Sequence, residues 1–224
     1  MNQLAQAFQE AARTVAESQR RLEDAYVDFA QSMVHALEAR DSYTAGHSRR
    51  VSAYAYDIAC EMKLDEELLE TIRVGALLHD IGKIGVPDAI LGKHDRLTDE
   101  EFDIIRQHPV IGQKILSGLG AFDRYIPIVE LHHENHDGTG YPHGLAEYKI
   151  PLDARIVHVA DAYDAMTSDR PYRKGMPDAL VLRILRDNSG TQFDPDVVNV
   201  FLALVKARRS GVLKGSEHAV QPVG

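Results

Sequence analysis

The chain has 224 residues, of which 44% are hydrophobic and 26% charged, and its formal net charge is −9. These values describe an ordinary globular protein with enough residues to bury a full core. The negative charge argues against binding polymeric nucleic acid through a broad basic face, although a local cluster of cations or metal ions can still hold a small anion. Cys60 is the single cysteine, and the chain has neither an apolar run of membrane-spanning length nor a signal-peptide core. It is therefore expected to be cytoplasmic, without a membrane segment.

Residues 2–40 contain no glycine or proline and are predicted to form one long helix. Apolar or small side chains recur along it every seven residues, at Phe8, Val15, Leu22, Phe29 and Ala36. This spacing fits a parallel coiled coil that joins two copies of the chain, and it fits equally well one amphipathic helix packed on its own domain. We expect residues 1–40 to be a linker helix through which the chain forms a homodimer. Such helices often connect a sensor to an output domain, so a regulatory domain could precede this chain.

From Asp41 the pattern changes to shorter amphipathic helices, and residues 41–210 are predicted to form a single all-α domain. Predicted helices begin near Thr44, Asp65, Thr98, Ile111, Pro127, Ala154, Pro177 and Pro195. The helix that starts at the Thr98–Glu101 capping box is expected to stop near His108. Residues 156–159 resemble a strand, but nothing nearby pairs with them, so they are assigned to a helix. The tail, residues 211–224, is predicted to be disordered.

Polar side chains interrupt one apolar helix stripe at its end, where His79, Asp80 and Lys83 follow Leu77 and Leu78. A buried unpaired carboxylate or ammonium costs several kcal/mol, so such groups normally find a partner or a metal. The adjacent His79 and Asp80 offer one imidazole nitrogen and one carboxylate that can bridge two ions. Taken alone, however, a His-Asp pair is more simply explained by a hydrogen-bonded core histidine followed by a helix end.

Further residues of types that bind metals lie beside apolar helix faces elsewhere in the chain. Together they favour a metal site over a structural role for His79 and Asp80. The full candidate set is His47, His79, Asp80, His108, His132, His133 and Asp161. Imidazole and carboxylate together suit Fe, Mn, Zn, Co or Ni, and no set of thiolates favours a structural zinc. Seven ligands exceed one tetrahedral site but match two metals that share a carboxylate. Two such metals can clamp a phosphoryl group and activate a bridging water, so the pattern points to metal-assisted phosphoester hydrolysis.

The motifs around these ligands resemble those of the HD-GYP phosphodiesterases. They are His47, His79-Asp80-Ile81-Gly82-Lys83, His108, His132-His133-Glu134, Asp137 to Pro142, Asp161 to Asp164, Asp169 to Arg173 and Phe193-Asp194-Pro195. The resemblance covers about residues 41–202 in order and spacing. It implies an all-helical HD-domain bundle that hydrolyses the bacterial messenger cyclic di-GMP to pGpG, GMP or both.

The resemblance also implies how the ligands divide between two metals. The first would be held by His47, His79, Asp80 and Asp161, and the second by Asp80 as a bridge with His108, His132 and His133. Iron is the most common metal in the family, and manganese or another divalent metal also occurs. Some members bind a third metal through a glutamate four residues before the first histidine, but this chain has Tyr43 there, so we expect two metals. Asn135 and His136 replace a frequent Arg-Trp pair, and their role is left open.

The same resemblance assigns the remaining polar residues to the substrate. Asp80 and Lys83 are the predicted catalytic residues, with Lys83 stabilising the charge that develops when a hydroxide held between the metals attacks phosphorus. Predicted substrate contacts are Lys83, Gly140, Tyr141, Asp164, Arg170 and Arg173. The two arginines suit a phosphate clamp, and Tyr141 offers a ring for guanine stacking. Asp164 could instead orient a metal ligand or the attacking water, or pair with Arg170.

The remaining expectations concern protein partners, supporting residues and alternative functions. The family suggests contacts with diguanylate cyclases of the GGDEF type. Glu134 is a candidate for orienting an imidazole, whereas His158 is expected on a helix surface. Two other functions stay open: a phosphohydrolase acting on another cyclic dinucleotide or nucleotide, and a signalling module that binds a nucleotide or partner with little turnover.

Overall fold

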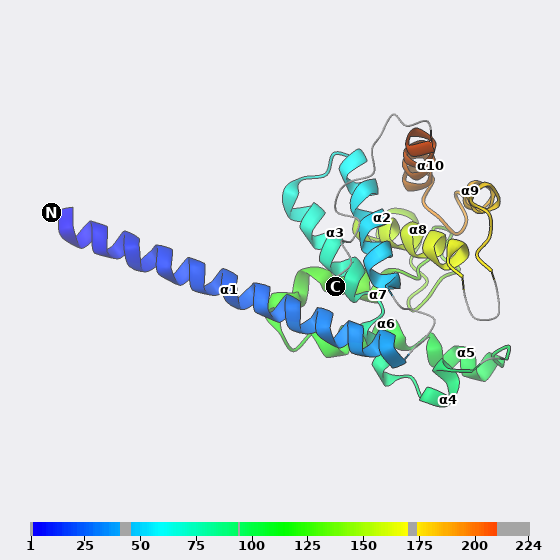
Figure 1. Ribbon diagram of the computed structural model, residues 1–224, viewed down its shortest axis with the longest axis horizontal. Coiled ribbons are helices and arrows are strands. Elements are labelled where there is room, and N and C mark those ends of the chain that lie inside the picture. Colours follow the sequence, from blue (N-terminus) through cyan, green and yellow to red (C-terminus); the bar gives the residue numbers. More distant parts are fainter. Residues whose placement is uncertain (1, 41–45, 94, 170–173, 210–224) are drawn as a thin grey trace.

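The computed structural model describes residues 2–40, 46–93, 95–169 and 174–209. Within these residues the chain is helical and contains two isolated β-bridges but no strand, which confirms the predicted all-α class. The elements are α1 (Asn2–Arg40), α2 (His47–Glu61), α3 (Glu66–Leu78), η1 (Ile81–Gly85), α4 (Asp88–Leu91), α5 (Asp99–Ile105), α6 (His108–Leu116), η2 (Gly120–Tyr125), α7 (Ile126–Leu131), η3 (Glu147–Lys149), α8 (Leu152–Thr167), α9 (Asp178–Asp187) and α10 (Pro195–Arg209). Figure 1 shows α1 projecting from a bundle that the other helices form.

The main core lies where α2, α3 and α8 meet, with α9 and α10 closing one side. Val51, Ala55 and Ile58 recur at three- and four-residue intervals on α2, so they form one buried stripe. Val157 and Ala160 of α8 belong to the same buried cluster. These three helices carry or adjoin His47, His79 and Asp161, so the core that stabilises the domain also fixes part of the candidate site.

A second, smaller core joins α1 to the domain. Val34 of α1 packs with Val74, Leu78 and Phe122, and the Tyr26 ring meets Phe122 edge-on at 6.5 Å. The end of α1 is therefore part of the domain rather than a free linker.

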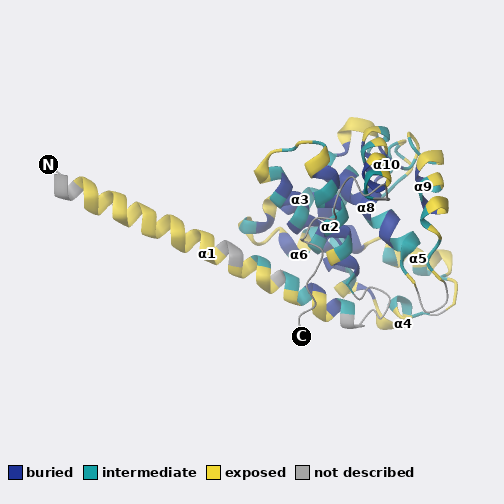
Figure 2. Cartoon of the chain, turned by 45° about the horizontal axis from the view of Figure 1, so that its top comes forward, coloured by how far each residue is buried: buried dark blue, intermediate teal, exposed yellow. Residues whose placement is uncertain are grey.

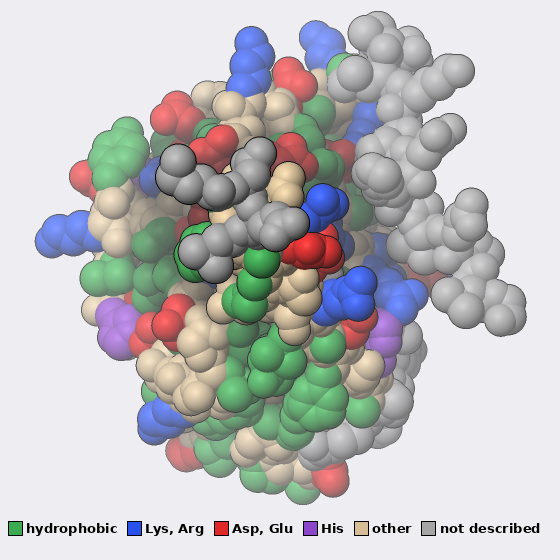
Figure 3. All heavy atoms as spheres, turned by 90° about the vertical axis from the view of Figure 1, so that its left-hand side faces the viewer, with side chains coloured by type: hydrophobic (Ala, Val, Ile, Leu, Met, Phe, Trp, Pro, Cys, Tyr) green, Lys and Arg blue, Asp and Glu red, His purple; other side chains and the backbone are tan. Residues whose placement is uncertain are grey.

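The other half of α1 stands away from the domain, and its seven-residue seam is uncovered. Phe8, Val15 and Leu22 keep 76%, 58% and 54% of their surface exposed. Figure 2 shows this half as exposed along its length. Figure 3, which faces the side toward which α1 projects, shows hydrophobic side chains gathered at the centre of that face. The end of α1 thus packs on its own domain, while the coiled coil and the dimer stay predictions for the exposed half.

Most local start and stop signals are confirmed, and one is wrong. Asp65 caps α3 by accepting a hydrogen bond from Leu68 N at 2.9 Å, and Thr98 with Glu101 forms the capping box of α5. His108, however, opens α6 instead of ending the helix that starts at Thr98. A proline in the first turn of a helix loses no hydrogen bond, so Pro109 starts a new helix rather than only stopping the previous one.

Some sequence-based expectations lie outside the described residues. They concern Tyr43, Thr44, Arg170, Arg173 and the tail 211–224. Among the described helices, none combines the length and the apolar character needed to cross a bilayer. The cytoplasmic location and the division at residues 40 and 210 stay predictions.

Candidate metal centre

Five segments bring the seven candidate ligands together. His47 and His108 are the first residues of α2 and α6, His79 and Asp80 follow α3, His132 and His133 follow α7, and Asp161 lies within α8. Two groups form, His47–His79–Asp80 and His108–His132–His133, and within each group the ligand atoms lie within 4.8 Å of one another. Asp161 joins the first group, since its Oδ1 is 3.1 Å from His47 Nε2. The predicted ligand set is therefore gathered in space, although its role in metal binding stays a prediction.

Gly82 allows the two groups to approach each other. A Cβ at this position would lie 1.9 Å from the His108 carbonyl oxygen and 2.5 Å from Gly112 N. Any larger residue would therefore push η1 away from the first turn of α6. The close backbone contact places Asp80, which directly precedes η1, 3.3 Å from His108 Nε2 through its Oδ1.

Asp80 faces both groups with its two carboxylate oxygens. While Oδ1 is turned to His108, Oδ2 lies 3.4 Å from His79 Nε2 and 4.0 Å from His47 Nε2. Lys83 Nζ donates a hydrogen bond of 2.7 Å to the same Oδ2. Burial pushes the pKa of Asp80 upward, but Lys83 and the neighbouring imidazoles outweigh burial and hold this pKa well below its ordinary value. The carboxylate is thus ionised and lies between the two groups.

The imidazoles are oriented with one nitrogen toward the backbone and the other toward the site. Nδ1 of His79, His108 and His132 each lies near the carbonyl oxygen three residues earlier, at 2.7, 2.8 and 3.0 Å. A carbonyl can only accept, so Nδ1 of each ring carries the hydrogen and Nε2 is the nitrogen that is turned toward the site. His79 Nε2 is buried and has no hydrogen-bond partner. This is how proteins orient histidines that bind metals.

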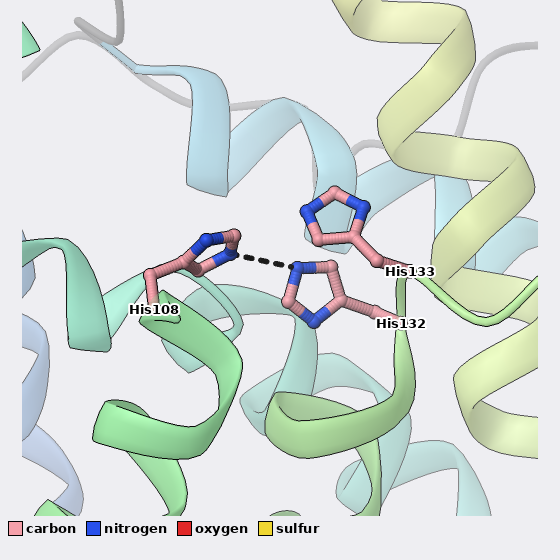
Figure 4. Close-up of side chains that lie close together, drawn as sticks. All are labelled: His108, His132 and His133. Atoms are coloured by element: carbon pink, nitrogen blue, oxygen red, sulfur yellow. Dashed lines mark hydrogen bonds between the residues drawn. The ribbon is translucent and has the colours of Figure 1, made fainter. Parts of the chain in front are cut away.

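The arrangement of His108 and His132 is the clearest sign that this site suits a cation. Their Nε2 atoms are 3.4 Å apart, and Figure 4 shows the two rings converging with His133. Burial lowers the pKa of His108 to about 4 and that of His132 well below its ordinary value, so both rings are neutral at pH 7. Two lone pairs then face each other, which is unfavourable unless a positive ion lies between them. Nitrogen ligands about 2.1 Å from one tetrahedral ion are separated by about this distance.

His47 is held by a group that the sequence left unresolved. Asp164 Oδ2 accepts a hydrogen bond of 2.7 Å from His47 Nδ1, while Arg50 Nε donates to Asp164 Oδ1 at 2.7 Å. Burial opposes protonation of His47, but the hydrogen bonds with Asp161 and Asp164 outweigh it and raise the pKa of His47 to about 9. Of the roles considered for Asp164, the geometry favours orientation of a ligand. Arg50 was not among the predicted site residues, although its position one turn after His47 was a usable signal.

A cavity of about 440 Å³ opens over the two groups. Its polar wall contains Lys83 and Tyr141 beside the candidate ligands, and Arg50 and Lys93 add two cations. The apolar part of the lining comes from the segment that includes α4 and α5, namely Ile90, Leu91, Leu97 and Ile105. The volume is in the range of small-molecule sites. The apolar wall and Lys93 were missed, because nothing local in the sequence connects them to the ligands.

The loop after α7 places one predicted substrate contact in the cavity and one beside it. The Tyr141 ring stacks on His133 with 4.8 Å between centroids, and the Arg106 guanidinium lies 5.5 Å from the Tyr141 centroid. A Cβ on Gly140 would lie 2.2 Å from Asn135 N, so this glycine allows the loop to pack on its own preceding backbone. Gly140 does not line the cavity, and its contact with substrate stays a prediction.

Glu134 and His158 have surroundings that differ from those predicted from the sequence. Glu134 does not touch a candidate ligand through its carboxylate, which instead accepts hydrogen bonds from the amides of His143 and Leu145 at 2.7 and 2.9 Å. His158 is buried rather than exposed on a helix surface, and its Nδ1 lies 2.8 Å from the Glu134 carbonyl oxygen. Both residues support the loop that carries Tyr141.

Fold and site together describe an all-helical protein with a His/Asp cluster that could bind metal ions. The sequence pattern of the HD domain matches residues 31–197, and the chain belongs to this family. A cyclic di-GMP phosphodiesterase of Thermotoga maritima is 43% identical over 192 residues, which cover 81% of this chain and 51% of the relative. A 3'3'-cGAMP-specific phosphodiesterase 3 of Vibrio cholerae is 39% identical over 187 residues, or 83% of this chain and 40% of the relative.

Among solved structures, Bd1817, a HDG"Y"P protein from Bdellovibrio bacteriovorus, superposes with a TM-score of 0.63 at 26% identity, covering 85% of this chain and 64% of that one. The curated relatives are phosphodiesterases of the HD-GYP type, which agrees with the resemblance of the motifs. The chain spans about half or less of the length of these relatives.

Proposed function

We propose that this chain carries a metal-dependent phosphodiesterase that hydrolyses cyclic di-GMP to pGpG, GMP or both, with two divalent metals at the candidate centre. The observation that carries the proposal is the ionised Asp80, whose two oxygens face the imidazole nitrogens of two separate groups of histidines. Iron is the first choice of metal and manganese the second, as the resemblance to the family implies; the donors, imidazole and carboxylate without thiolate, suit both.

The residues divide between the two ions as follows. His47, His79, Asp80 and Asp161 would hold the first ion, and Asp80, His108, His132 and His133 the second. When bound, the ions supply Lewis acidity toward the phosphoryl oxygens and lower the pKa of a water. Lys83 adds a fixed cation next to the bridging carboxylate and stabilises negative charge on the phosphoryl group.

Substrate binding uses both walls of the cavity. A cyclic dinucleotide carries two phosphates and two flat bases. Arg50 and Lys93, which pair with Asp164 and Glu101, line the cavity as cations for the phosphates. Arg170 and Arg173 are the predicted phosphate clamp. Tyr141 and the apolar wall offer surfaces for the bases.

A second substrate is favoured by one specific observation, the relative from Vibrio cholerae whose name specifies 3'3'-cGAMP. This substrate differs from cyclic di-GMP in one base only, so the metal chemistry would be the same. The contacts that the cavity makes with that base would determine which substrate is preferred. Comparison of kcat/KM for cyclic di-GMP and 3'3'-cGAMP separates the two functions.

The decisive test is turnover by protein prepared without oxygen and loaded with Fe(II) or Mn(II). We expect linear product from the loaded protein and none from His79→Ala or from protein treated with a chelator. Glu100→Gln serves as a control, because Glu100 is exposed on α5. Metal bound at two equivalents with no product would reject the activity. Tight nucleotide binding in the same sample would instead support the signalling module.

For partners, a homodimer through α1 is part of the same proposal, as are contacts with GGDEF-type diguanylate cyclases. The exposed seam of Phe8, Val15 and Leu22 supports the homodimer, because an uncovered apolar stripe at heptad spacing matches the seam of a parallel coiled coil.

A further inference from the structure

Glu38, near the end of α1, reaches across to the start of α2. Its Oε2 accepts a hydrogen bond from Gly46 N at 3.1 Å, and its Oε1 accepts one from Ser48 N at 3.1 Å. The first amides of a helix have no partner within the helix and need an outside acceptor. The carboxylate is also favourably placed against the positive end of the helix dipole.

This cap differs from those of α3 and α5. Asp65 and Thr98 are the N-cap residues of their own helices and supply the acceptor themselves. The N-cap residue of α2 is Gly46, which has no side chain and a left-handed φ of 68°. The acceptor therefore comes from another helix, eight to ten residues earlier in the chain.

The residue held between these two amides is His47, the first residue of α2 and a candidate ligand of the first metal. Its Nε2 lies 3.1 Å from Asp161 Oδ1, so a small displacement of the first turn would move the imidazole away from the site. Glu38 itself is anchored, because its neighbours Val34 and Leu37 on α1 are buried in the domain.

We infer that Glu38 is a positioning residue for the first metal: by capping α2 from α1, it fixes His47 in the ligand geometry and links that ion to the long helix. This inference rests on the proposed metal centre. The second ion is not affected in the same way, since His108 and His132 take their orientation from carbonyls of their own segments.

Through these hydrogen bonds of Glu38, a movement of α1 would also affect the candidate metal centre. The same helix contacts α3 and η1, the segments on either side of His79 and Asp80. A shift of α1 along or around its axis would therefore change the first metal site at both His47 and Asp80. The half of α1 that carries the exposed seam is continuous with this end.

The experiment is a calorimetric titration of the metal-free protein with Mn²⁺ under anaerobic conditions. Glu38→Gln keeps the shape of the side chain but removes its charge and one acceptor, and Glu38→Asp keeps the charge but shortens the reach. Glu17→Gln is the matched control, since Glu17 is on the same helix and pairs only locally with Arg13 at 2.9 Å. We expect Glu38→Gln to weaken one of the two Mn²⁺ equivalents by about tenfold and to leave the other unchanged. Glu38→Asp should weaken the same equivalent, whereas Glu17→Gln should weaken neither.

Two double variants separate positioning from general destabilisation. In the His108→Ala background, which keeps the first ion, Glu38→Gln should still weaken the remaining equivalent by about tenfold; in the His47→Ala background, which keeps the second ion, Glu38→Gln should leave the remaining equivalent unchanged. Full affinity for both equivalents in Glu38→Gln, or equal weakening of the remaining equivalent in the two backgrounds, would overturn the inference while leaving the metal centre intact. Failure of the wild-type protein to bind Mn²⁺ would instead reject the proposed function, and this inference with it.

Discussion

Lys83 and Asp80 form a partly buried ion pair in which Lys83 Nζ donates a 2.7 Å hydrogen bond to the carboxylate oxygen that also faces His79. The pair places a proposed bridging ligand and a fixed cation within one turn of chain. Removing the carboxylate and removing the ammonium should therefore have different consequences.

Asp80→Asn should abolish binding of both metals, because an amide oxygen is a weak ligand and cannot bridge two cations. We expect activity to fall by at least about a thousandfold, since Lewis-acid stabilisation is worth several kcal/mol. Elemental analysis should report less than one metal per chain, against one retained in His108→Ala. Two metals per chain in Asp80→Asn would show that the bridge is wrongly assigned.

The Lys83→Met variant should still bind both metals but should have a lower kcat. A cation placed where charge develops contributes roughly 10²–10³-fold, so we expect a loss of this size in kcat. Lys93→Met is a suitable comparison, because Lys93 lines the cavity but pairs with Glu101 rather than with a candidate ligand, so its loss should mainly raise KM. Steady-state kinetics on metal-loaded protein distinguishes the two patterns. Equal effects of both substitutions on KM alone would contradict a catalytic role for Lys83.

Metal binding to the first site should become tighter as pH rises. The pKa of His47 is raised to about 9 in the metal-free protein, so at pH 7 this imidazole is protonated and must lose its proton to bind the ion. Affinity for that equivalent should increase up to about tenfold per pH unit and level off above about pH 9.

The second site supplies the internal control for this pH dependence. The pKa of His108 is lowered to about 4, so its ring is already neutral and binding should change little between about pH 6 and pH 9. Calorimetry in two buffers of different ionisation enthalpy counts the released protons. Proton release that is equal for the two equivalents would argue against a protonated His47.

Gly82→Ala should destabilise the domain and separate the two groups of ligands. The added Cβ would meet the His108 carbonyl oxygen at 1.9 Å, a backbone atom that cannot turn aside. We expect a loss of about 1–3 kcal/mol in the free energy of unfolding, together with weaker metal binding. Gly118→Ala is the matched control, because a Cβ there has no neighbour within 4 Å. Thermal melting that ranks the two variants equally would contradict this packing role.

Replacing Phe8, Val15 and Leu22 with glutamine should convert a dimer into a monomer without unfolding the domain. These side chains are exposed in the single chain, so the substitution removes contacts between copies only. Glu10→Gln with Ala16→Gln changes the same helix off the seam and should leave the dimer intact. Sedimentation equilibrium measures the outcome. Truncation before residue 41 is a poorer test, because it would also remove the buried Val34 and Leu37.

Local patterns were sufficient for much of the fold and for the chemistry of the site. The capping signals at Asp65 and Thr98 act within four residues, and the seam of α1 follows from its seven-residue spacing. Such signals depend on neighbours in the chain, so they can be read without tertiary structure. The boundary at His108 failed because Pro109 can stop one helix and start the next, and the sequence alone does not decide between these roles.

The candidate ligands were predicted as a set, because their residue types and motifs are typical of a family. Which residue supports which ligand was not predicted. Asp164 holds His47 across 117 positions, and Glu38 caps a helix to which it does not belong. The sequence by itself determined an all-helical chain, the chemistry of its metal-type residues and a long N-terminal helix with an apolar seam. Only the tertiary structure decided which carboxylate supports which histidine and which half of α1 stays exposed, because hydrogen bonds and burial depend on distances in space that no local spacing of residues encodes.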